Sequence, residues 1–404
     1  MQVINNHCAG LDVHKKTVVA CVITPQIKEI RTFGTMTNEI LEMCDWMTEH
    51  GVTHVAMEST GVYWKPVYNL LEVLSINILL VNAQHIKAVP GRKTDVKDAE
   101  WIADLLRHGL LQGSYVPDRE QRELRELVRY RRSLTQEKAR VVNRIQKVLE
   151  GANIKLSSVA TDVVGVTGRA MLTAISEGVN NPEELTRFVK GRLRSKKAAL
   201  MEAMKGLIGP HQQMMLKSQL RHLGFLEQEI KEISEDIAER MTSVEEVIVQ
   251  FDAIPGVGRR AAEDVLAEIG LDMSRFPTSR HLASWAKVCP GNNESAGKRI
   301  SGVTGKGNRW LRSALVEAAW MASRSKDNYL STQFKRISVR RGAKRAALAV
   351  AHTILVMMYH MLSRRTSYSD LGCAYFDHQN IQHVVRRSVN RLENLGYKVS
   401  LVPA

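Results

Sequence analysis

The sequence has few of the features that mark secreted, disulfide-bonded or membrane proteins. Its 404 residues include five cysteines, which are scattered and form no Cys-x-x-Cys pair. This argues against a disulfide framework or a zinc finger and favours a reducing compartment. The N-terminus has no apolar signal-peptide core. The longest apolar stretch, residues 346–362, contains two histidines and is short for a membrane span. We expect a cytoplasmic protein in which this stretch is a buried helix.

Acidic side chains are fewer than basic ones. The chain has 57 lysines and arginines but 42 aspartates and glutamates, which gives a net charge of +15 and an isoelectric point near 9.6. Hydrophobic content of 44% and charged content of 25% are ordinary for a soluble globular protein, and the length suggests two or three domains. Because the cations cluster along the chain, the charge favours a nucleic-acid partner over an anionic membrane.

The stretch KTDVKDAEWIADLLRHGLL, residues 93–111, holds two acids at helical spacing. Asp95 and Asp98 are three residues apart, so a helix from about residue 95 to 110 would project both carboxylates from one face. An apolar stripe would pack this helix against the core of the domain and leave the face with the two carboxylates free. The stripe consists of Trp101, Ile102, Leu105 and Leu106.

Two further acids stand where predicted strands end: Asp12 in AGLDVHKKT and Glu58 in VAMESTGVYW. Four carboxylates brought to one point would suit Mg²⁺ or Mn²⁺, hard ions that prefer oxygen ligands. Each acid alone has a plainer interpretation. An aspartate at a strand end is usually a turn or cap residue, and Asp95 could be a helix N-cap, with Asp98 favoured by the helix dipole. The metal-site hypothesis therefore depends on a fold that brings the four together.

The order of elements in residues 1–117 predicts such a fold. Apolar patterns predict five strands, at residues 3–12, 17–24, 31–36, 54–58 and 76–81. Helical patterns cover residues 38–50 and 61–74, followed by the acidic helix. Three strands, helix, strand, helix, strand and helix is the order of a ribonuclease-H-like (RuvC-like) α/β fold. That fold holds its metal ligands on the first strand, at the end of the fourth strand and on the last helix.

Residues 118–250 read as a connector built from two long amphipathic helices. Apolar residues recur every seven positions in the first helix and again over residues 216–249. The first set is Leu127, Leu134, Val141 and Val148, and the second is Leu216, Leu223, Ile230, Ile237 and Val244. Such heptads predict a coiled coil, either as a hairpin within the chain or as a contact between subunits.

Cations accompany this connector. On the first helix they are expected on the outside, and they are Arg129, Arg131, Arg132, Lys138, Arg140 and Arg144. Residues 155–212 look like a helical insert with a basic patch of its own, formed by Arg187, Lys190, Arg192, Arg194, Lys196 and Lys197.

A third domain is expected over residues 251–404. It opens with Ile254-Pro255-Gly256-Val257-Gly258 before the amphipathic segment RRAAEDVLAEIG. This resembles a helix-hairpin-helix turn, in which Gly256 and Gly258 would let backbone N–H groups approach a nucleic-acid phosphate. The alternative is an ordinary loop before a helix.

A serine among cations follows. Ser295 lies in an Asn-Asn-Glu-Ser-Ala-Gly segment that we expect to be a flexible loop. A hydroxyl surrounded by cations suits attack on a phosphodiester, because the cations offset phosphate charge. Serine in such loops is also common turn chemistry. The neighbouring cations are Lys298, Arg299, Lys306, Arg309 and Arg312, and a second basic stripe includes Arg340 and Arg341.

At this point the chain resembles the insertion-sequence 110 family of transposases, in its 1111-like branch, and is similar to the Piv DNA invertases. The stretches that carry the resemblance are GLDVHKKTVVACV, MESTGVYWKPVYNLLE, VNAQHIKAVPGRKTDVKDAEWIADLLRHGLL, IPGVGRRAAEDVLAEIG and PGNNESAGKR with GKGNRWLRSALVEAA. They span both ends of the chain, and residues 155–212 carry no matching motif.

The resemblance implies an N-terminal RuvC-like domain with an Asp-Glu-Asp-Asp tetrad, a coiled-coil connector and a C-terminal transposase domain with a catalytic serine. The tetrad falls on Asp12, Glu58, Asp95 and Asp98, and Lys93 falls in the nucleic-acid-binding set. The family loop runs Pro, four residues, then Ser-Gly. Here Pro290 and four residues precede Ser295-Ala296-Gly297. The implied catalytic serine is Ser295, with Ser301 and Ser284 as alternatives.

The resemblance also implies a reaction and partners. A Mg²⁺-assisted attack by the serine on a DNA phosphodiester would give a covalent phosphoserine and a free 3′-hydroxyl. The implied partners are double-stranded DNA of the element ends and target, a structured non-coding guide (bridge) RNA, and further copies in a homodimer or homotetramer. Such a protein would work in the cytoplasm of a prokaryote, associated with the nucleoid.

Two other hypotheses fit the same residues. One is a RuvC-type Holliday-junction nuclease with the same fold, which would use a metal-activated water as nucleophile. The other is a non-catalytic nucleic-acid-binding scaffold in which the acids are structural. Loss of a covalent protein–DNA adduct on Ser295→Ala would separate the first hypothesis from the nuclease.

Overall fold

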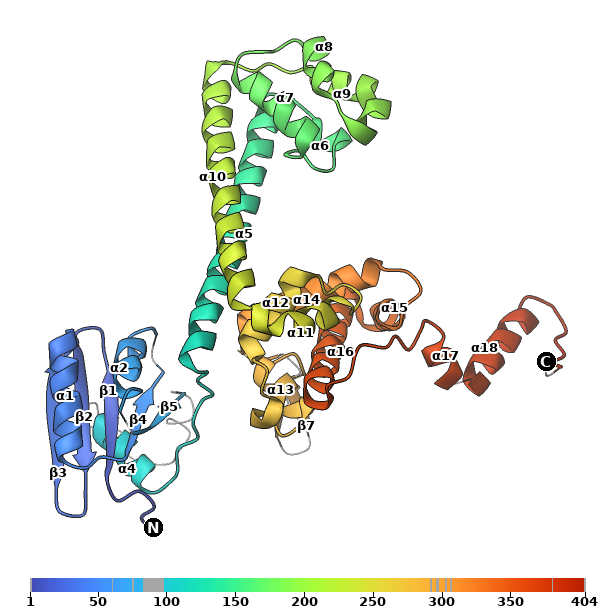
Figure 1. Cartoon of the computed structure of the whole chain (residues 1–404). Coiled ribbons are helices and arrows are strands. Elements are labelled where there is room, and N and C mark those ends of the chain that lie inside the picture. The colour runs from blue at the N-terminus through green and yellow to red at the C-terminus, as the bar shows by residue number, and fades with distance from the viewer. Residues whose placement is uncertain are drawn as a thin grey trace. The chain divides into compact units, whose positions relative to one another are not determined.

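The computed structural model describes residues 2–59, 61–74, 76–82, 98–290, 293–295, 298–301, 304–305, 307–379 and 381–402, with the backbone alone for 293–295, 298–301 and 383–384. The chain forms two compact units, Met1–Pro117 and Asp118–Ala404 (Figure 1). The division falls at Pro117, where the composition of the sequence changes. The further boundary predicted at residue 250 lies inside the second unit and stays a prediction.

The first unit is built on a five-stranded mixed sheet. Its strands are β1 (Cys8–Val13), β2 (Thr17–Ile23), β3 (Lys28–Gly34), β4 (His54–Glu58) and β5 (Asn77–Val81). Their order across the sheet is β3-β2-β1-β4-β5. The first three strands are antiparallel, while β4 is parallel to both β1 and β5. The neighbouring parallel strands β1 and β4 therefore end at the same edge of the sheet.

Helices cover both faces of this sheet. One face packs against α1 (Thr37–Glu49) and α2 (Trp64–Leu71) in a shared apolar core. The opposite face packs against α4 (Asp98–Arg107). The two faces follow from the alternation of side chains along each strand: Ala9, Leu11 and Val13 of β1 belong to the first core, and Cys8 belongs to the second.

The predicted order of strands and helices is found, with shifted boundaries. The first strand begins at Cys8 and not at residue 3. The N–H groups of Ile4 and Asn5 both donate to the carbonyl of Arg107, at 2.9 and 3.1 Å, so this part of the chain bonds to the end of α4 and not to a strand. The expected class, a sheet domain followed by a mainly helical remainder, is confirmed.

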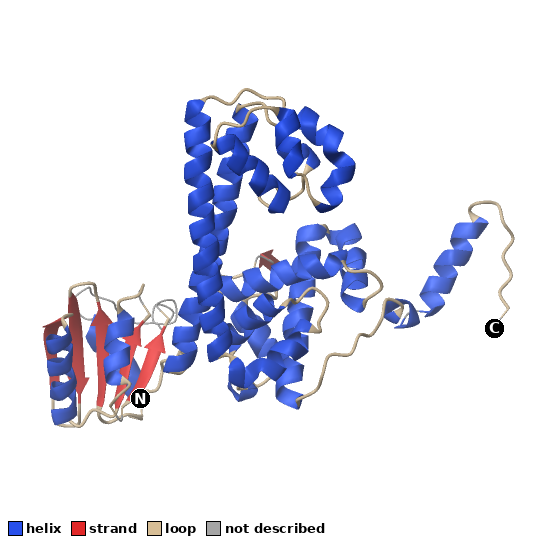
Figure 2. Cartoon of the chain, turned by 45° about the horizontal axis from the view of Figure 1, so that its top comes forward, coloured by secondary structure: helices blue, strands red, loops and turns tan. Residues whose placement is uncertain are grey.

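The second unit begins with two long helices that lie side by side, α5 (Arg119–Gly151) and α10 (Pro210–Arg240) (Figure 2). They run in opposite directions and share one apolar core, to which Leu134 and Val141 contribute from α5 and Leu216 and Leu223 from α10. Most of the predicted apolar seam of the two helices is thus buried within one chain. The second helix ends at Arg240, earlier than expected. A 3₁₀ turn over Thr242–Val244 separates it from α11 (Glu245–Asp252).

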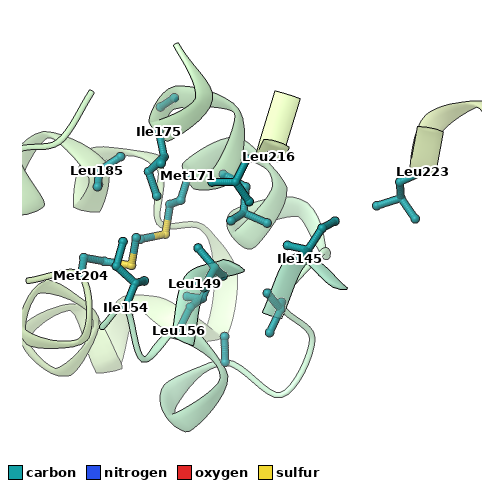
Figure 3. Packing of buried hydrophobic residues seen from close by; sticks show 14 of the residues in the cluster. Ile145, Leu149, Ile154, Leu156, Met171, Ile175, Leu185, Met204, Leu216 and Leu223 are labelled. Carbon is teal, nitrogen blue, oxygen red and sulfur yellow. The ribbon is translucent and has the colours of Figure 1, made fainter. Parts of the chain in front are cut away.

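Residues between α5 and α10 form a helical lobe at the far end of this pair. Its elements are α6 (Leu156–Val159), α7 (Val166–Ser176), α8 (Pro182–Leu185), the 3₁₀ helices η2 (Thr186–Phe188) and η3 (Gly191–Lys196), and α9 (Lys197–Ala203). Figure 3 shows their side chains packed around Leu149 and Leu156. The lobe and the tip of the helical pair therefore have a single core.

The remaining residues form a helical bundle. It contains α12 (Arg259–Ile269), α13 (Ser279–Ala286), α14 (Arg309–Arg324), α15 (Tyr329–Arg341) and α16 (Ala343–Arg364), with the small strands β6 (Asn293–Ser295) and β7 (Lys298–Ser301), and is followed by α17 (Tyr375–Gln379) and α18 (Ile381–Glu393). Among the described residues, only α16 is long and apolar enough to cross a membrane by length and composition. Half of its apolar window is buried against neighbouring helices, as a core helix would be.

Candidate functional site

Two of the predicted acids stand side by side at the edge where β1 and β4 end. Leu11 pairs with Met57 in the parallel ladder, so the next residues, Asp12 and Glu58, are at the same level. Leu11 and Met57 belong to the core under α1 and α2. Because successive side chains alternate between faces, Asp12 and Glu58 both point to the opposite face, which α4 covers.

The helix α4 lies directly on β1 at Gly10. A Cβ atom at Gly10 would stand 2.2 Å from the carbonyl oxygen of Ala99 and 2.3 Å from the amide nitrogen of Ala103. No side chain fits at such distances, so glycine is what lets the helix backbone come this close to the strand.

The helix α4 is oriented so that its first residue lies toward the end of the sheet that carries Asp12 and Glu58. Its last residue, Arg107, bonds to Ile4, ahead of β1, whereas Ala99 lies over Gly10. The helix therefore runs antiparallel to β1, and its start at Asp98 lies toward the end of the strand that carries Asp12. The described residues thus place three of the four predicted acids on one face of the sheet.

These acids are partly shielded from solvent. The side chain of Asp12 is 20% exposed, and its Oδ2 lies 2.9 Å from Nε2 of His14. Glu58 and Asp98 are half-buried, and Oδ1 of Asp98 is buried. His14 was not predicted as a site residue. Its position two residues after Asp12 could have indicated it, because period-two alternation returns a side chain to the same face.

The donor set suits a hard divalent cation, although no complete cage is described. Within the described residues, no three His, Cys, Asp or Glu side chains lie close enough together to hold a metal ion. Asp95, the fourth predicted ligand, lies outside those residues, as does Lys93. Asp12, Glu58 and Asp98 offer carboxylate oxygens, which fit Mg²⁺ or Mn²⁺ better than softer metals. The metal site itself remains a prediction.

The predicted serine lies at the end of a β-hairpin. Ser295 is the last residue of β6 and is the ladder partner of Lys298 in β7, while Glu294 pairs with Arg299. The structure therefore places Ser295 in a short strand where a loop was expected, and the flexibility of this segment stays a prediction. The backbone places a lysine directly opposite Ser295. Of the alternatives, Ser301 ends β7, and Ser284 is exposed on α13.

The two glycines of the predicted phosphate-binding turn differ. Gly256 has a φ of +86°, and a Cβ there would lie 2.4 Å from the carbonyl oxygen of Ala318 and 2.3 Å from the amide nitrogen of Ala322 in α14. Glycine at position 256 is thus required by packing and backbone conformation. Gly258 is the N-cap of α12, with a φ of −82°, and no atom lies within 4 Å of its hypothetical Cβ.

A cavity of about 720 Å³ opens at this end of α12. It lies among α5, the turn, α12 and α14, and its lining includes Arg131, Arg132, Gly258, Arg259 and Arg260. Helix N-termini favour anions because their first N–H groups lack helical partners. Gly258 is therefore the better candidate of the two glycines for a phosphate contact, which stays a prediction.

Substituting each glycine by alanine separates packing from binding. We expect Gly256→Ala to lower the free energy of unfolding by about 3 kcal/mol, because it combines a positive φ with a clash against backbone. Gly258→Ala should change stability by less than about 1 kcal/mol. Urea denaturation of both variants, with DNA-binding affinity measured on the folded proteins, checks this. Equal stability losses would contradict the packing assigned to Gly256.

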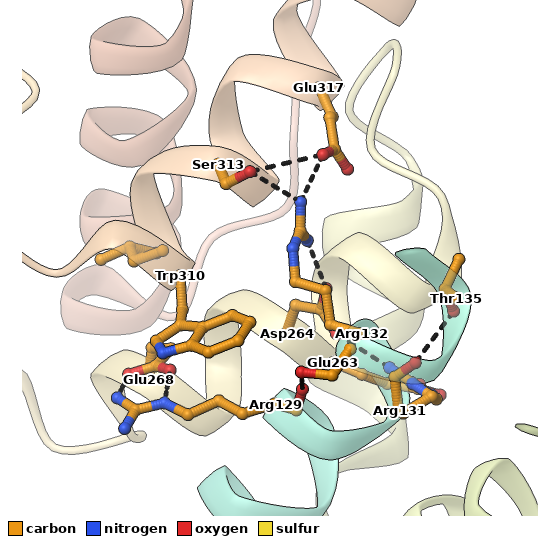
Figure 4. Close-up of polar contacts among 12 residues, drawn as sticks. Arg129, Arg131, Arg132, Thr135, Glu263, Asp264, Glu268, Trp310, Ser313 and Glu317 are labelled. Carbon is orange, nitrogen blue, oxygen red and sulfur yellow. Dashed lines mark hydrogen bonds and ion pairs between the residues drawn. The ribbon is translucent and has the colours of Figure 1, made fainter. Parts of the chain in front are cut away.

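Arg131 and Arg132 of α5 are not on the outside of the helix, contrary to the prediction, whereas Arg140 and Arg144 are exposed as expected. The side chain of Arg131 is 3% exposed and donates to Glu263 at 2.5 Å and Asp264 at 2.9 Å. Arg132 is 11% exposed, donates to Asp264 at 3.0 Å and also pairs with Glu317 (Figure 4). The expectation of an outward basic face fails here because α12 presents buried carboxylates to these cations.

Glu268 extends this network toward α14. Its carboxylate accepts from Arg129 at 2.7 and 2.8 Å and from the side-chain amide of Asn308 at 2.6 Å. Asn308 is also the N-cap of α14, because its Oδ1 accepts from the amides of Trp310 and Leu311 at 3.1 Å. Burial raises the pKa of Asp264, while hydrogen bonds from Arg131 and Arg132 act in the opposite direction. The network joins α5, α12 and the start of α14.

The other predicted nucleic-acid contacts are mostly at the surface. Arg309 is exposed and lies over the ring of Trp310, with its guanidinium carbon 4.8 Å from the ring centroid. Arg312 is half-buried and donates to the carbonyl of Gly305 at 3.3 Å. Arg340 and Arg341 are exposed at the end of α15. Lys306 lies outside the described residues.

Comparison with known protein families gives two matches. A family described as "Transposase" matches residues 9–154, and a family described as "Transposase IS116/IS110/IS902 family" matches residues 250–335. The first match contains all four predicted acids, and the second contains Gly256, Gly258 and Ser295. The two matches leave residues 155–249 between them.

Full-length relatives agree with these matches. The "Transposase for insertion sequence element IS1111A" of Coxiella burnetii is 25% identical over 324 residues, which cover 78% of this chain and 79% of the relative. A "Probable family 20 transposase" of Pseudomonas aeruginosa is 26% identical over 321 residues, 78% of this chain and 85% of the relative. The "Pilin gene-inverting protein" of Moraxella lacunata is 21% identical over 375 residues, 89% of this chain and 96% of the relative. The predicted resemblance is confirmed: the chain belongs to the insertion-sequence 110 family of transposases, in the group with IS1111, and is an enzyme that acts on DNA.

Proposed function

We propose that this transposase moves an insertion sequence by serine attack on a DNA phosphodiester, assisted by a divalent cation bound to carboxylates of the first unit. The observation that carries the proposal is that Asp12 and Glu58 each follow the last ladder pair of β1 and β4, Leu11 and Met57, and so lie next to each other on the face of the sheet covered by α4. The strand order, with β1 central and β2 antiparallel to it, is the support for a ribonuclease-H-like (RuvC-like) fold.

The acids would hold the cation through oxygen ligands. Asp12 and Glu58 stand on neighbouring strands, and Asp98 begins the helix that covers their face, with Asp95 three residues earlier in the sequence. A bound Mg²⁺ or Mn²⁺ would polarise the scissile phosphate and lower the effective pKa of an attacking hydroxyl. His14 beside Asp12 would hold that carboxylate in orientation.

Ser295 is the proposed nucleophile. Its Oγ would form a bond to phosphorus as the bond from phosphorus to the 3′ oxygen breaks, and the proton from the serine hydroxyl would pass to the released 3′-hydroxyl. The DNA 5′-phosphate would remain on Ser295 as a phosphodiester, which conserves bond energy for strand exchange. Lys298, opposite Ser295 in the hairpin, would offset negative charge in the transition state.

The partners follow from charge and family. A net charge of +15 suits a nucleic-acid load, and we propose double-stranded element and target DNA together with a structured guide RNA. We also propose a homodimer or homotetramer in the cytoplasm, at the nucleoid. Since α5 and α10 bury their heptad seam against each other, the support is for a coiled-coil hairpin within the chain, and assembly would use other surfaces.

The test is a search for a covalent protein–DNA adduct. Wild-type protein is incubated with labelled element-end DNA, its flanking transcript and Mg²⁺, and denaturation-resistant adducts are mapped by mass spectrometry. We expect the adduct on Ser295, its complete loss in Ser295→Ala, and its retention in Ser284→Ala and Ser301→Ala. Cleavage by Ser295→Ala at the wild-type rate without an adduct would replace the proposal with a nuclease that uses water.

A further inference from the structure

A cationic segment of the lobe between α5 and α10 has no role in the reaction described above. Over residues 187–197, RFVKGRLRSKK, the sequence has six cations and no acid. We call this segment the lobe basic strip. All six of its cationic side chains are exposed, and they are Arg187, Lys190, Arg192, Arg194, Lys196 and Lys197.

The backbone of the strip is fixed by its apolar members. Val189 is buried in the core shared with the helical pair, and Leu193 packs against that core. The amide of Lys190 donates to the buried hydroxyl of Thr167 at 3.0 Å, which ties the strip to the start of α7. The charged side chains between these anchors therefore project from a rigid surface, so less conformational entropy is lost when a ligand binds.

The strip differs from the other arginine-rich part of the second unit. On α5, Arg129, Arg131 and Arg132 form ion pairs with carboxylates. In the described part of the chain, the strip makes no ion pair with any carboxylate, although Glu183 and Glu184 of α8 lie close in sequence. Six like charges held close together without ion pairs repel one another, and a bound polyanion would relieve that repulsion.

We propose that the lobe basic strip binds the phosphodiester backbone of nucleic acid, as a surface separate from the acidic site and the serine hairpin. The inference rests on the proposed function only in requiring a nucleic-acid substrate. Neither family match includes this segment, since they end at residue 154 and resume at 250. The chemistry recognised is a row of phosphates, from either the DNA duplex or a structured RNA.

Charge reversal tests the proposal. In the full chain, Lys190→Glu, Arg192→Glu and Arg194→Glu are combined, with a second variant carrying glutamine at all three positions. A matched control reverses three exposed cations on the helical pair: Lys147, Lys217 and Arg221. Affinities for a random-sequence DNA duplex and for an RNA hairpin are measured by fluorescence anisotropy between about 50 and 200 mM KCl.

We expect the strip variants to bind about 10- to 100-fold more weakly and the slope of log K against log salt to fall by about 2 to 3, because each lost phosphate contact removes close to one unit. Loss on the duplex alone assigns the strip to DNA, loss on the hairpin alone assigns it to RNA, and loss on both assigns it to any phosphate backbone. Affinity and slope equal to those of the control on both probes would overturn the proposal.

The same assay distinguishes this proposal from the proposed reaction. Asp12→Asn and Ser295→Ala leave the strip intact, so both should bind with the wild-type salt slope whether or not they form an adduct. Near-wild-type circular dichroism of the strip variants shows that the lobe is folded, as expected for changes at exposed side chains.

Discussion

Asp12→Asn and Glu58→Gln should each reduce adduct formation on element-end DNA by at least about 1,000-fold, equivalent to about 4 kcal/mol of transition-state stabilisation. An amide preserves the size of each side chain and removes the charge that would hold the cation. Asp12 contacts the exposed His14, a type of pair that contributes about 1 kcal/mol or less. The variants should therefore fold and bind DNA, and the loss should be in the chemical step.

A carboxylate elsewhere on α4 provides the matched control. Asp104 is 46% exposed, beside His108 on the same helix. Asp104→Asn should cleave DNA at close to the wild-type rate. If Asp104→Asn and Asp12→Asn lost activity equally, the effect would lie in the helix and not in the proposed site. Full activity in both Asp12→Asn and Glu58→Gln would favour a scaffold whose acids are structural.

Arg131→Ala should lower the free energy of unfolding of the second unit by about 3 to 5 kcal/mol. Removing this 3%-exposed side chain leaves Glu263 and Asp264 buried without one of their cations. Arg259 still pairs with Glu263, and Arg132 still pairs with Asp264. We therefore expect the loss in free energy of unfolding to be near the lower end of this range. Urea denaturation followed by fluorescence measures the change.

The pH dependence gives this prediction a second readout. Burial already raises the pKa of Asp264 above its ordinary 3.8, and loss of Arg131 should raise it further. A carboxyl with a raised pKa in the folded state favours folding when protonated. The deficit of Arg131→Ala should therefore be constant while the pH is above the pKa of Asp264 in the folded variant, and should shrink as the pH falls through that pKa. Asp264→Asn in the Arg131→Ala background should remove this dependence.

An exposed ion pair serves as the control for Arg131. Lys231 and Glu235 on α10 are 66% and 67% exposed and 3.8 Å apart. Lys231→Ala should change stability by no more than about 0.5 kcal/mol. A stability loss in Arg131→Ala as small as that in Lys231→Ala would show that the network does not hold α5 to α12.

The first unit could be predicted from sequence because its information is local. Alternating apolar residues and helical stripes specify the strands and helices, and the acids fall at their ends. The close contact between β1 and α4 at Gly10 could not be predicted from such local patterns. A glycine in a strand indicates a bulge or a near approach, but not that Ala99 and Ala103 are its neighbours.

The connector shows where pattern alone is insufficient. On α10 the heptad residues Leu216, Leu223 and Ile230 are buried as predicted. On α5 the expected Leu134 and Val141 are buried, but toward the two ends Val128 and Leu149 are buried next to the half-buried Leu127 and Val148. The two ends of α5 have different neighbours: Arg125 contacts α12 near the start of the helix, and Leu149 packs with residues of the lobe near its end. A heptad pattern in one helix does not indicate which neighbour each part of that helix will have.

The prediction of an outward basic face on α5 failed at Arg131 and Arg132 for a different reason. A run of arginines on a helix is compatible with a solvated face, a nucleic-acid surface or an internal ion-pair network. The deciding residues, Glu263, Asp264 and Glu268, lie more than a hundred positions away on α12. The lobe basic strip has the same composition without such partners, so the structure separates two segments that sequence alone treats alike.

The central claim is that residues far apart in the first unit gather around one divalent cation, and metal-directed backbone cleavage tests it most directly. Fe²⁺ is exchanged into the full chain in place of Mg²⁺, hydroxyl radicals are generated with ascorbate and peroxide, and the fragments are mapped. The account predicts cuts near residues 12, 58 and 95–98, suppressed by excess Mg²⁺ and lost in Asp12→Asn. Cuts near one of these segments alone, or cuts unaffected by Mg²⁺, would contradict it.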